Sequence, residues 1–233
     1  MKKLFYVVFV VLMVLSFSVL AQAQSSTKGI YVGLIGGYVI PSTLNGNSTP
    51  VGAPIAYDYD LDLKNGYLVG AKVGWLTPFS NRALAVEFEY NHIENKMDYW
   101  DNFLGTGLEA ETDGKVKIDS FMFNLIARYP TGRFHPYLGA GAGCAYVKMS
   151  DMDHSFMGSY IGTINGGSDT VFAYQVMAGL DFDITQNIII GMSYKYLVLD
   201  KISFDSFNNI WGPSKTELDY KAHNIMLSLS YVF

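Results

Sequence analysis

Strict alternation of apolar and other side chains is the feature of this sequence that most constrains its fold. Toward the end of the chain, every second position is apolar: Ile225, Leu227, Leu229, Tyr231 and Phe233. The same period recurs in seven earlier segments, residues 30–40, 67–75, 84–90, 120–129, 138–146, 172–182 and 188–196. A period of two is that of a β-strand, because a helix repeats every 3.6 residues. The sequence therefore predicts eight strands of about ten residues, the length that a tilted strand needs to cross a bilayer.

The connections between these segments alternate in length. Short turns are expected near residues 78–82, 130–134 and 185–187, and long polar loops near 41–65, 93–114, 150–169 and 201–215. Short connections on one side and long ones on the other are typical of outer-membrane barrels. We therefore predict an all-β fold, an eight-stranded antiparallel up-and-down transmembrane barrel with short periplasmic turns and four long extracellular loops.

Composition agrees with a chain that faces lipid. The 233 residues are 50% hydrophobic and 15% aromatic, and only 16% are charged, against about 25% in ordinary soluble domains. Such a chain is too apolar for intrinsic disorder, and its net charge of −5 disfavours nucleic-acid binding. An eight-stranded barrel is too narrow to hold the bulky apolar face inside. That face is therefore predicted to point outward into the membrane.

The N-terminal segment has the features of an export signal. Lys2 and Lys3 precede an apolar stretch over residues 4–20, and Ala21-Gln22-Ala23 supplies a small–x–small cleavage pattern. We expect residues 1–23 to be a cleaved signal for the Sec pathway and residues 24–233 to form the barrel domain. The alternative is a permanent N-terminal anchor, because the stretch approaches the roughly 20 residues that span a bilayer.

Charged residues on the predicted inward face are the main candidate site. They are Lys72, Glu87, Glu89, Arg128, Asp181 and Lys195. Because unpaired charge is costly in a narrow lumen, we expect these groups to pair across it. The network could form a constriction for small solutes, or it could simply fill the lumen. The glycines at positions 139, 141 and 143 could leave room for these side chains or serve barrel curvature.

The expected extracellular loops are acidic and carry exposed aromatic residues. The candidate contact residues are Asp98, Trp100, Asp101, Phe103 and Trp211. Aromatic residues are enriched at protein interfaces, although they also occur in the aromatic belts of membrane proteins. The acids Asp58, Asp60 and Asp62 do not match the spacing of a calcium-binding EF-hand. No metal site and no cofactor is therefore predicted.

An enzymatic role has one weak candidate. Catalysis of hydrolysis would need a histidine with a serine or acid partner near the outer rim. Only Asp153-His154-Ser155 offers such groups, and neighbours in sequence are weak evidence for a triad. The single Cys144 lies on the predicted lipid face, where a thiol acts as a small apolar group. We therefore expect a protein that is not an enzyme.

Three segments resemble a known family. They are residues 135–141 (HPYLGAG), residues 172–179 (FAYQVMAG) and the final strand ending in Phe233. These segments are similar to blocks of the small OmpA-like and opacity-type outer-membrane barrels, and within that family they most resemble the group of the rickettsial major surface antigens. The resemblance implies a Gram-negative outer-membrane location and a C-terminal strand that the barrel assembly machinery reads. It also implies a range of functions, since the family includes adhesins, weak pores and structural proteins. Peptidoglycan binding, which belongs to an additional domain of OmpA, is not expected.

Taken together, these features predict a non-enzymatic surface protein, structural or adhesive through its acidic extracellular loops. The alternatives are a low-conductance channel for small solutes and, less favoured, a lipid-modifying enzyme. The expected partners are outer-membrane lipid and lipopolysaccharide, the barrel assembly machinery and a host-surface ligand, with no nucleic acid.

Overall fold

The structure is a computed structural model, and it describes residues 29–42, 44–50, 57–61, 63–102, 109–156, 159–164, 166–208 and 212–233. The predicted export signal, Asp62, Phe103 and Trp211 lie outside these ranges. Within them, no helix is long and apolar enough to cross a membrane.

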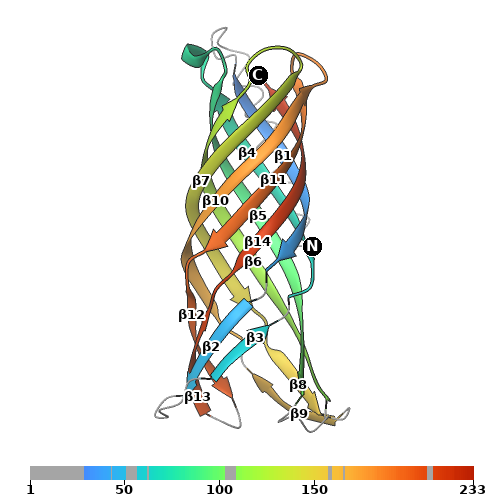
Figure 1. The fold of residues 1–233 in the computed structure, drawn as a ribbon, viewed down its shortest axis with the longest axis vertical. Helices are drawn as coiled ribbons and strands as arrows, with labels where there is room; N and C mark the ends of the chain where they lie inside the picture. The colour runs from blue at the N-terminus through green and yellow to red at the C-terminus, as the bar shows by residue number, and fades with distance from the viewer. Residues whose placement is uncertain are drawn as a thin grey trace, which may run out of the picture.

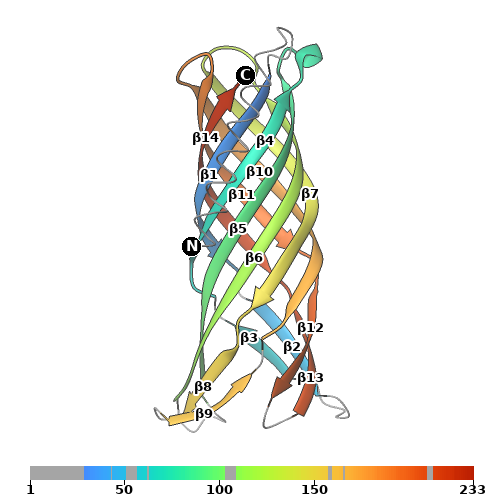
Figure 2. The ribbon, with the colours of Figure 1, turned by 180° about the vertical axis from the view of Figure 1, so that it is seen from behind.

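Eight strands form a closed antiparallel barrel, as predicted (Figures 1 and 2). Their bounds are β1 (Ile30–Pro41), β4 (Gly66–Leu76), β5 (Leu84–Asn102), β6 (Glu109–Arg128), β7 (Phe134–Met149), β10 (Ser168–Asp183), β11 (Ile188–Leu199) and β14 (Lys221–Val232). Each strand pairs with its neighbours along the chain, and the pairing of β1 with β14 closes the ring. Closure leaves no free edge at membrane depth, so the backbone groups there are satisfied without water.

The long connections contain further strands, which the sequence did not predict. Three hairpins lie there: β2 (Leu44–Pro50) with β3 (Tyr57–Leu61), β8 (Met152–Phe156) with β9 (Ser159–Ile164), and β12 (Ile202–Asn208) with β13 (Gly212–Leu218). The hairpins also pair with one another and with the outer part of β6, so they extend the wall at the lower end of Figure 1. Their pairing satisfies backbone donors and acceptors that an irregular loop would leave to water.

The short turns lie at the opposite end of the barrel. One contains the 3₁₀ turn η1 (Pro78–Ser80), followed by Asn81 and Arg82 in the left-handed region at φ 53° and 64°. The Thr77 hydroxyl donates to the Leu84 carbonyl at 2.9 Å and closes this turn. The first and last barrel strands meet here too, where the Phe233 amide donates to the Ile30 carbonyl at 2.9 Å.

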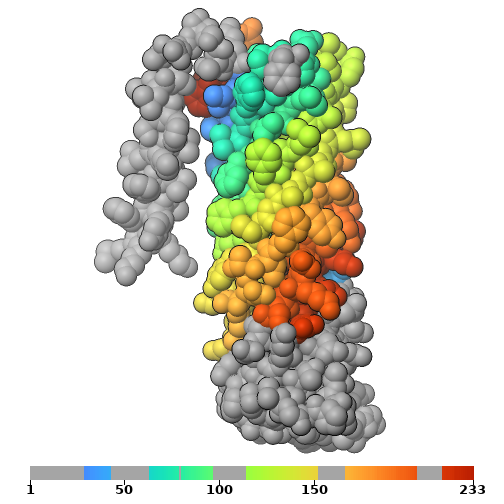
Figure 3. Space-filling model, turned by 90° about the vertical axis from the view of Figure 1, so that its left-hand side faces the viewer, coloured from blue at the N-terminus to red at the C-terminus, as the bar shows by residue number. Residues whose placement is uncertain are grey.

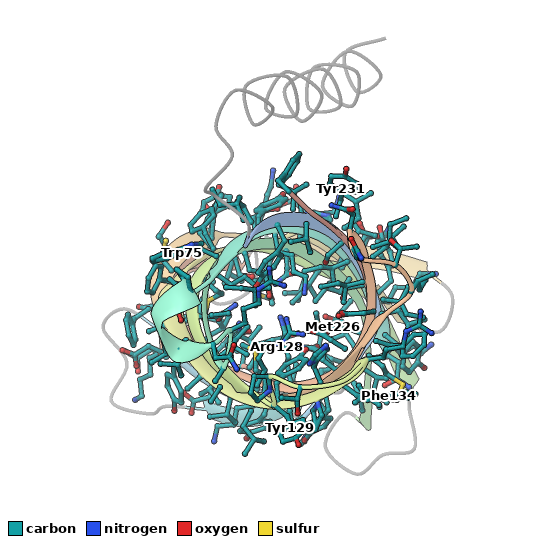
Figure 4. All side chains as sticks on the ribbon, turned by 90° about the horizontal axis from the view of Figure 1, so that it is seen from above. Trp75, Arg128, Tyr129, Phe134, Met226 and Tyr231 are labelled. Carbon is teal, nitrogen blue, oxygen red and sulfur yellow. The ribbon has the colours of Figure 1, made fainter. Side chains whose placement is uncertain are left out.

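Alternate side chains point to opposite sides of the wall, with the faces assigned as predicted. Leu34, Leu138 and Leu227 on the outer face are 65–67% exposed, and Cys144 is exposed there too. Viewed along the barrel axis, Trp75, Tyr129, Phe134 and Tyr231 lie outside the ring, whereas Arg128 and Met226 lie inside it (Figure 4). From the side, the outer side chains form a continuous surface over the described strands (Figure 3). The apolar surface is therefore turned toward lipid.

The interior is layered, and this corrects the expectation of a mainly polar lumen. A polar layer lies between two apolar clusters. The cluster on the hairpin side includes Val39, Ile93 and Ile118, all fully buried, and the smaller one near the short turns includes Tyr31 and Tyr137. The hairpin side of the barrel therefore has a core like that of a soluble protein.

The reason is an inversion of the amphipathic pattern along the strands. In the membrane-depth part of β6, Phe121 and Phe123 point outward and Asn124 points inward. Closer to the hairpins, Lys117 points outward and Ile118 points inward. A wall that faces lipid needs apolar residues outside, whereas one that faces water needs them inside. The inversion marks the level at which the wall leaves the membrane.

Candidate functional site

The polar layer inside the barrel is built around two ion pairs. The Lys72 ammonium lies 3.4 Å from the Glu87 carboxylate, and the Lys195 ammonium donates to the Glu89 carboxylate. Glu87, Glu89 and Lys195 are almost completely buried. Lys72 comes from β4, both glutamates come from β5, and Lys195 comes from β11, so the second pair crosses the lumen. The two pairs balance in charge.

Neutral side chains join the two pairs into one network. Asn124 donates to both glutamates, at 3.2 Å to Glu87 and 3.3 Å to Glu89, and accepts a hydrogen bond from Gln175 at 2.7 Å. The Tyr31 hydroxyl donates to Glu87 at 2.8 Å. Every carboxylate of the layer therefore has several donors, which is the condition under which buried charge is tolerated.

Glycines on the inward face make space for this network. A Cβ on Gly74 would collide with the Tyr31 ring, and one on Gly141 would collide with the Asn124 amide. Gly139 instead faces the Met177 side chain and the Leu125 carbonyl oxygen, and Gly143 faces backbone atoms of Phe121 and Met122. The glycines of β7 therefore accommodate an amide, a methionine side chain and the backbone of β6, and not the charged side chains.

Among the described residues, no hydrogen bond or salt bridge joins the other two predicted inward charges to the network. Arg128 is buried and Asp181 is half-buried, and neither forms a salt bridge within the described part of the chain. The Arg128 side chain points into the lumen near the short-turn end (Figure 4).

His135 lies just after the short turn that was expected near residues 130–134. It is the second residue of β7 and is buried. One ring nitrogen lies 2.7 Å from the Tyr129 carbonyl, and the other lies 3.1 Å from the Asp183 carboxylate. Both partners are acceptors, so both ring nitrogens are in position to donate. His135 thus ties the turn before β7 to the end of β10.

The expected loop contacts belong in part to strands. Asp98, Trp100 and Asp101 lie in the outer part of β5, with Asp98 opposite Asp113 and Trp100 opposite Glu111 in the register with β6. Their side chains lie outside what the structure describes. Among the described residues, no group of three or more histidine, cysteine or acidic side chains is arranged to hold a metal ion.

The predicted assembly residues lie on the lipid face of β14. Ile225, Leu227, Leu229 and Tyr231 are 47–65% exposed, and the Tyr231 ring contacts Phe233 edge-on with centroids 5.0 Å apart.

Two features of the outer surface were missed by reasoning from the sequence. His92 and Tyr90 on β5 both contact the Asp119 carboxylate of β6, at 2.8 and 2.7 Å. Beyond them, toward the hairpins, exposed lysines of three adjacent strands gather. Continuing the alternation outward from Phe121 would have placed Lys117 and Lys115 on this face. The register that brings the strands together cannot be read from alternation alone.

A closed eight-stranded barrel with an apolar lipid face and inward polar groups defines a transmembrane β-barrel of a Gram-negative outer membrane. The chain belongs to the family described as "Outer membrane protein beta-barrel domain", whose model matches residues 9–233. The resemblance to small outer-membrane barrels is thereby confirmed.

Individual relatives agree with this assignment. The chain is 31% identical to outer membrane protein PagN of Salmonella typhimurium over 134 residues, which are 55% of this chain and 55% of that protein. It is 26% identical to the putative adhesin RC1281 of Rickettsia conorii over 147 residues, 60% of this chain and 56% of that protein. The chain therefore spans about half the length of these curated relatives. The crystal structure of OprG from Pseudomonas aeruginosa has the same fold, with a TM-score of 0.58, 13% identity, and coverage of 89% of this chain and 97% of that one.

Proposed function

We propose that this protein is a non-enzymatic surface protein of the outer membrane, structural or adhesive through the hairpins at its extracellular end. The observation that carries the proposal is the filled interior. Fully buried Val39, Ile93 and Ile118 lie on the hairpin side of a charge-balanced polar layer. The barrel then acts as a support, and the hairpins make the contacts.

A relative and the sequence of the hairpins support an adhesive role. RC1281 of Rickettsia conorii is described as a putative adhesin. The segments 57–62 and 98–113 are rich in acidic residues, with Trp100 and Phe103 among them. An acidic surface with a few aromatic groups suits a basic or mixed protein partner, since aromatic residues are favoured in interfaces.

Replacement of the hairpins tests this proposal. The three hairpins, residues 44–61, 152–164 and 202–218, and the outer ends of β5 and β6 with their connection, residues 98–113, would each be replaced by a short turn, and adherence of bacteria to host cells and matrix would be measured. At least one replacement is expected to abolish adherence while heat-modifiable gel mobility shows an intact barrel. If all four variants adhere like the wild type, the adhesive role is wrong and a structural one remains.

The inward charges favour a second candidate, a low-conductance channel. Lys72 and Lys195 lie in the lumen, each paired with a glutamate. If each lysine left its present glutamate for another partner, a polar path would open through that layer. Purified protein in planar bilayers is the test. A channel would give conducting events that change with Lys72→Ala, and a silent trace from both proteins would remove this candidate.

An enzymatic role has little support among the described histidines. His92 contacts Asp119, His135 contacts a carbonyl and Asp183, and His223 contacts the Tyr194 hydroxyl at 2.6 Å. Among the described residues, none of these contacts is to a serine or cysteine that could act as a nucleophile. The structure does not describe the side chain of His154, and an unchanged lipid A profile in His154→Ala bacteria would remove that candidate.

We also propose that the barrel assembly machinery reads the C-terminal strand. Leu227, Leu229, Tyr231 and Phe233 would form its recognition face. Deletion of Phe233 is then expected to lower the amount of barrel in the outer membrane several-fold, measured by fractionation. Refolding of the purified variant in detergent should stay unchanged, because the machinery is absent there.

A further inference from the structure

Four exposed lysines form a patch on one side of the barrel. They are Lys96 of β5, Lys115 and Lys117 of β6, and Lys148 of β7, with the acid Glu94 among them. We call these five residues the lysine patch. In the next row away from the membrane Asp98 is opposite Asp113, so the lysines lie between an acidic row and the membrane.

The strand register sets like charges side by side in the patch. Lys96 is directly opposite Lys115, and Lys117 is directly opposite Lys148. Side chains in such positions have Cβ atoms about 5 Å apart, and like charges there destabilise the sheet. Lys117 is also opposite Glu94 in the register with β5, and one carboxylate cannot neutralise two such pairs.

The one acid within the patch is insufficient for this purpose. Glu94 accepts a hydrogen bond from Lys115 at 3.1 Å and lies 3.5 Å from Lys117. The Lys115 hydrogen bond lowers the pKa of the Glu94 carboxyl, which therefore stays ionised near neutral pH. Among the described residues, Lys148 has no acidic partner. The nearby Asp119 is engaged by His92 and Tyr90.

The patch lies at the level where the wall leaves the membrane. Two rows nearer the membrane than the Lys117–Lys148 pair, Phe121 and Cys144 are opposite each other on the lipid face, and Tyr146 lies in the row between. The amphipathic pattern inverts within these rows. Each residue adds about 3.3 Å along a strand, so Lys117 and Lys148 lie about 7 Å along the strands from the row of Tyr146 and about 13 Å from the row of Phe121. This is the level of lipid headgroups and their phosphates.

Between the patch and the short turns, the lipid face has a column of small residues that lies between two columns of large ones. Ala140, Ala142 and Cys144 of β7 are exposed and point outward. Their neighbours in register are large: Leu125, Phe123 and Phe121 on β6, and Val176, Tyr174 and Phe172 on β10. An acyl chain lying along this column would contact the small residues of β7, with the larger side chains of β6 and β10 on either side of it. A soluble anion without an acyl chain would not contact this column.

We propose that the lysine patch binds the phosphate groups of a phosphorylated glycolipid in the outer leaflet, with an acyl chain of that lipid on the small column of β7. The lysines supply the charge, and the column distinguishes a lipid from a free sugar phosphate. The proposal is independent of whether the hairpins adhere to a host, so either can fail alone.

Binding of bis-phosphorylated lipid A is the test. The intact barrel in zwitterionic detergent micelles would be titrated with lipid A, and the retained lipid counted by native mass spectrometry. Lys117→Gln/Lys148→Gln is expected to weaken binding about 25-fold, since each lysine near an anionic lipid surface contributes about 5-fold. Lys117→Arg/Lys148→Arg should restore it. Dephosphorylated lipid A should bind the wild type as weakly as the double variant binds lipid A.

A matched control lies on the opposite side of the barrel. Lys201→Gln/Lys221→Gln removes the same charge near β14, four strands from β6 in either direction, and should leave lipid A binding unchanged. Ala142→Phe fills the small column and should weaken binding of lipid A without affecting a phosphorylated sugar that lacks acyl chains. Gel mobility confirms that each variant is folded. Equal binding by wild type and Lys117→Gln/Lys148→Gln, equal loss in the control, or tight binding of the sugar with no effect of Ala142→Phe would each overturn the proposal.

Discussion

The Glu89 carboxylate shows how a single residue can be held inside the barrel. It accepts hydrogen bonds from Lys195, from Asn124 at 3.3 Å and from Asn91 at 2.5 Å, and it is fully buried. Removing one partner of a buried ion pair is more destabilising than removing both, because an uncompensated charge remains.

The Glu89–Lys195 pair therefore gives a prediction with a clear sign. Lys195→Met should lower the free energy of unfolding by about 3–5 kcal/mol, whereas adding Glu89→Gln should recover most of that loss. Urea unfolding in lipid vesicles, followed by gel mobility, measures both variants. A double variant as unstable as Lys195→Met would show that the residues contribute separately.

A second residue-scale prediction concerns close packing at Gly141. A Cβ at this position would collide with the Asn124 amide, the hub of the polar network. Gly141→Ala should lower the free energy of unfolding by about 1–3 kcal/mol, as overpacking of a filled interior does. Gly36→Ala is the control, because a Cβ there meets no atom within 4 Å. If the two variants have the same stability, the network tolerates a shift of Asn124.

At the scale of a strand, β6 combines two environments in one element. Its outer part has the pattern of a soluble protein, and its membrane part has the reverse. Ile118 lies in the outer part and is fully buried, whereas Leu227 of β14 lies on the lipid face and is 65% exposed.

These two positions should respond differently to truncation. Ile118→Ala leaves a cavity in a packed core and should cost about 2–5 kcal/mol. Leu227→Ala should cost less, because lipid chains can refill the space that a packed core leaves empty. Unfolding in urea in the same vesicles compares them, and equal losses would contradict a packed outer core.

Alternation in the sequence was sufficient to predict the strands at membrane depth, their faces and the closed barrel. It could not predict the strands in the long connections, which include the outer ends of β5 and β6. Segments such as 98–113 lack apolar residues at alternate positions and pair through the backbone. It also could not predict which inward charges meet. Lys195 and Glu89 are 106 residues apart, and their contact depends on the registers of all the intervening strands. The inversion in β6 was not predicted, because the expected strand began at residue 120 and the inverted positions lie before it.

At the scale of the whole molecule, the proposed function makes the barrel the support and the hairpins the parts that make contacts. The apolar outer face anchors it, the filled lumen makes it rigid, and the hairpins face the medium (Figure 1). The family match and the fold agree that the chain forms an outer-membrane barrel. The hairpins and the lysine patch are the parts for which the chemistry of a partner can be tested.

The inversion of the amphipathic pattern also determines how deep the molecule sits. A bilayer thicker than the apolar band would cover Lys117 and Lys148, and a thinner one would expose Tyr146 and Phe172 to water. Each ångström of mismatch between the apolar band and the bilayer costs free energy, so the barrel resists displacement along the membrane normal. The hairpins are consequently held at a constant height above the outer leaflet, which determines how far from the membrane surface any ligand would meet them.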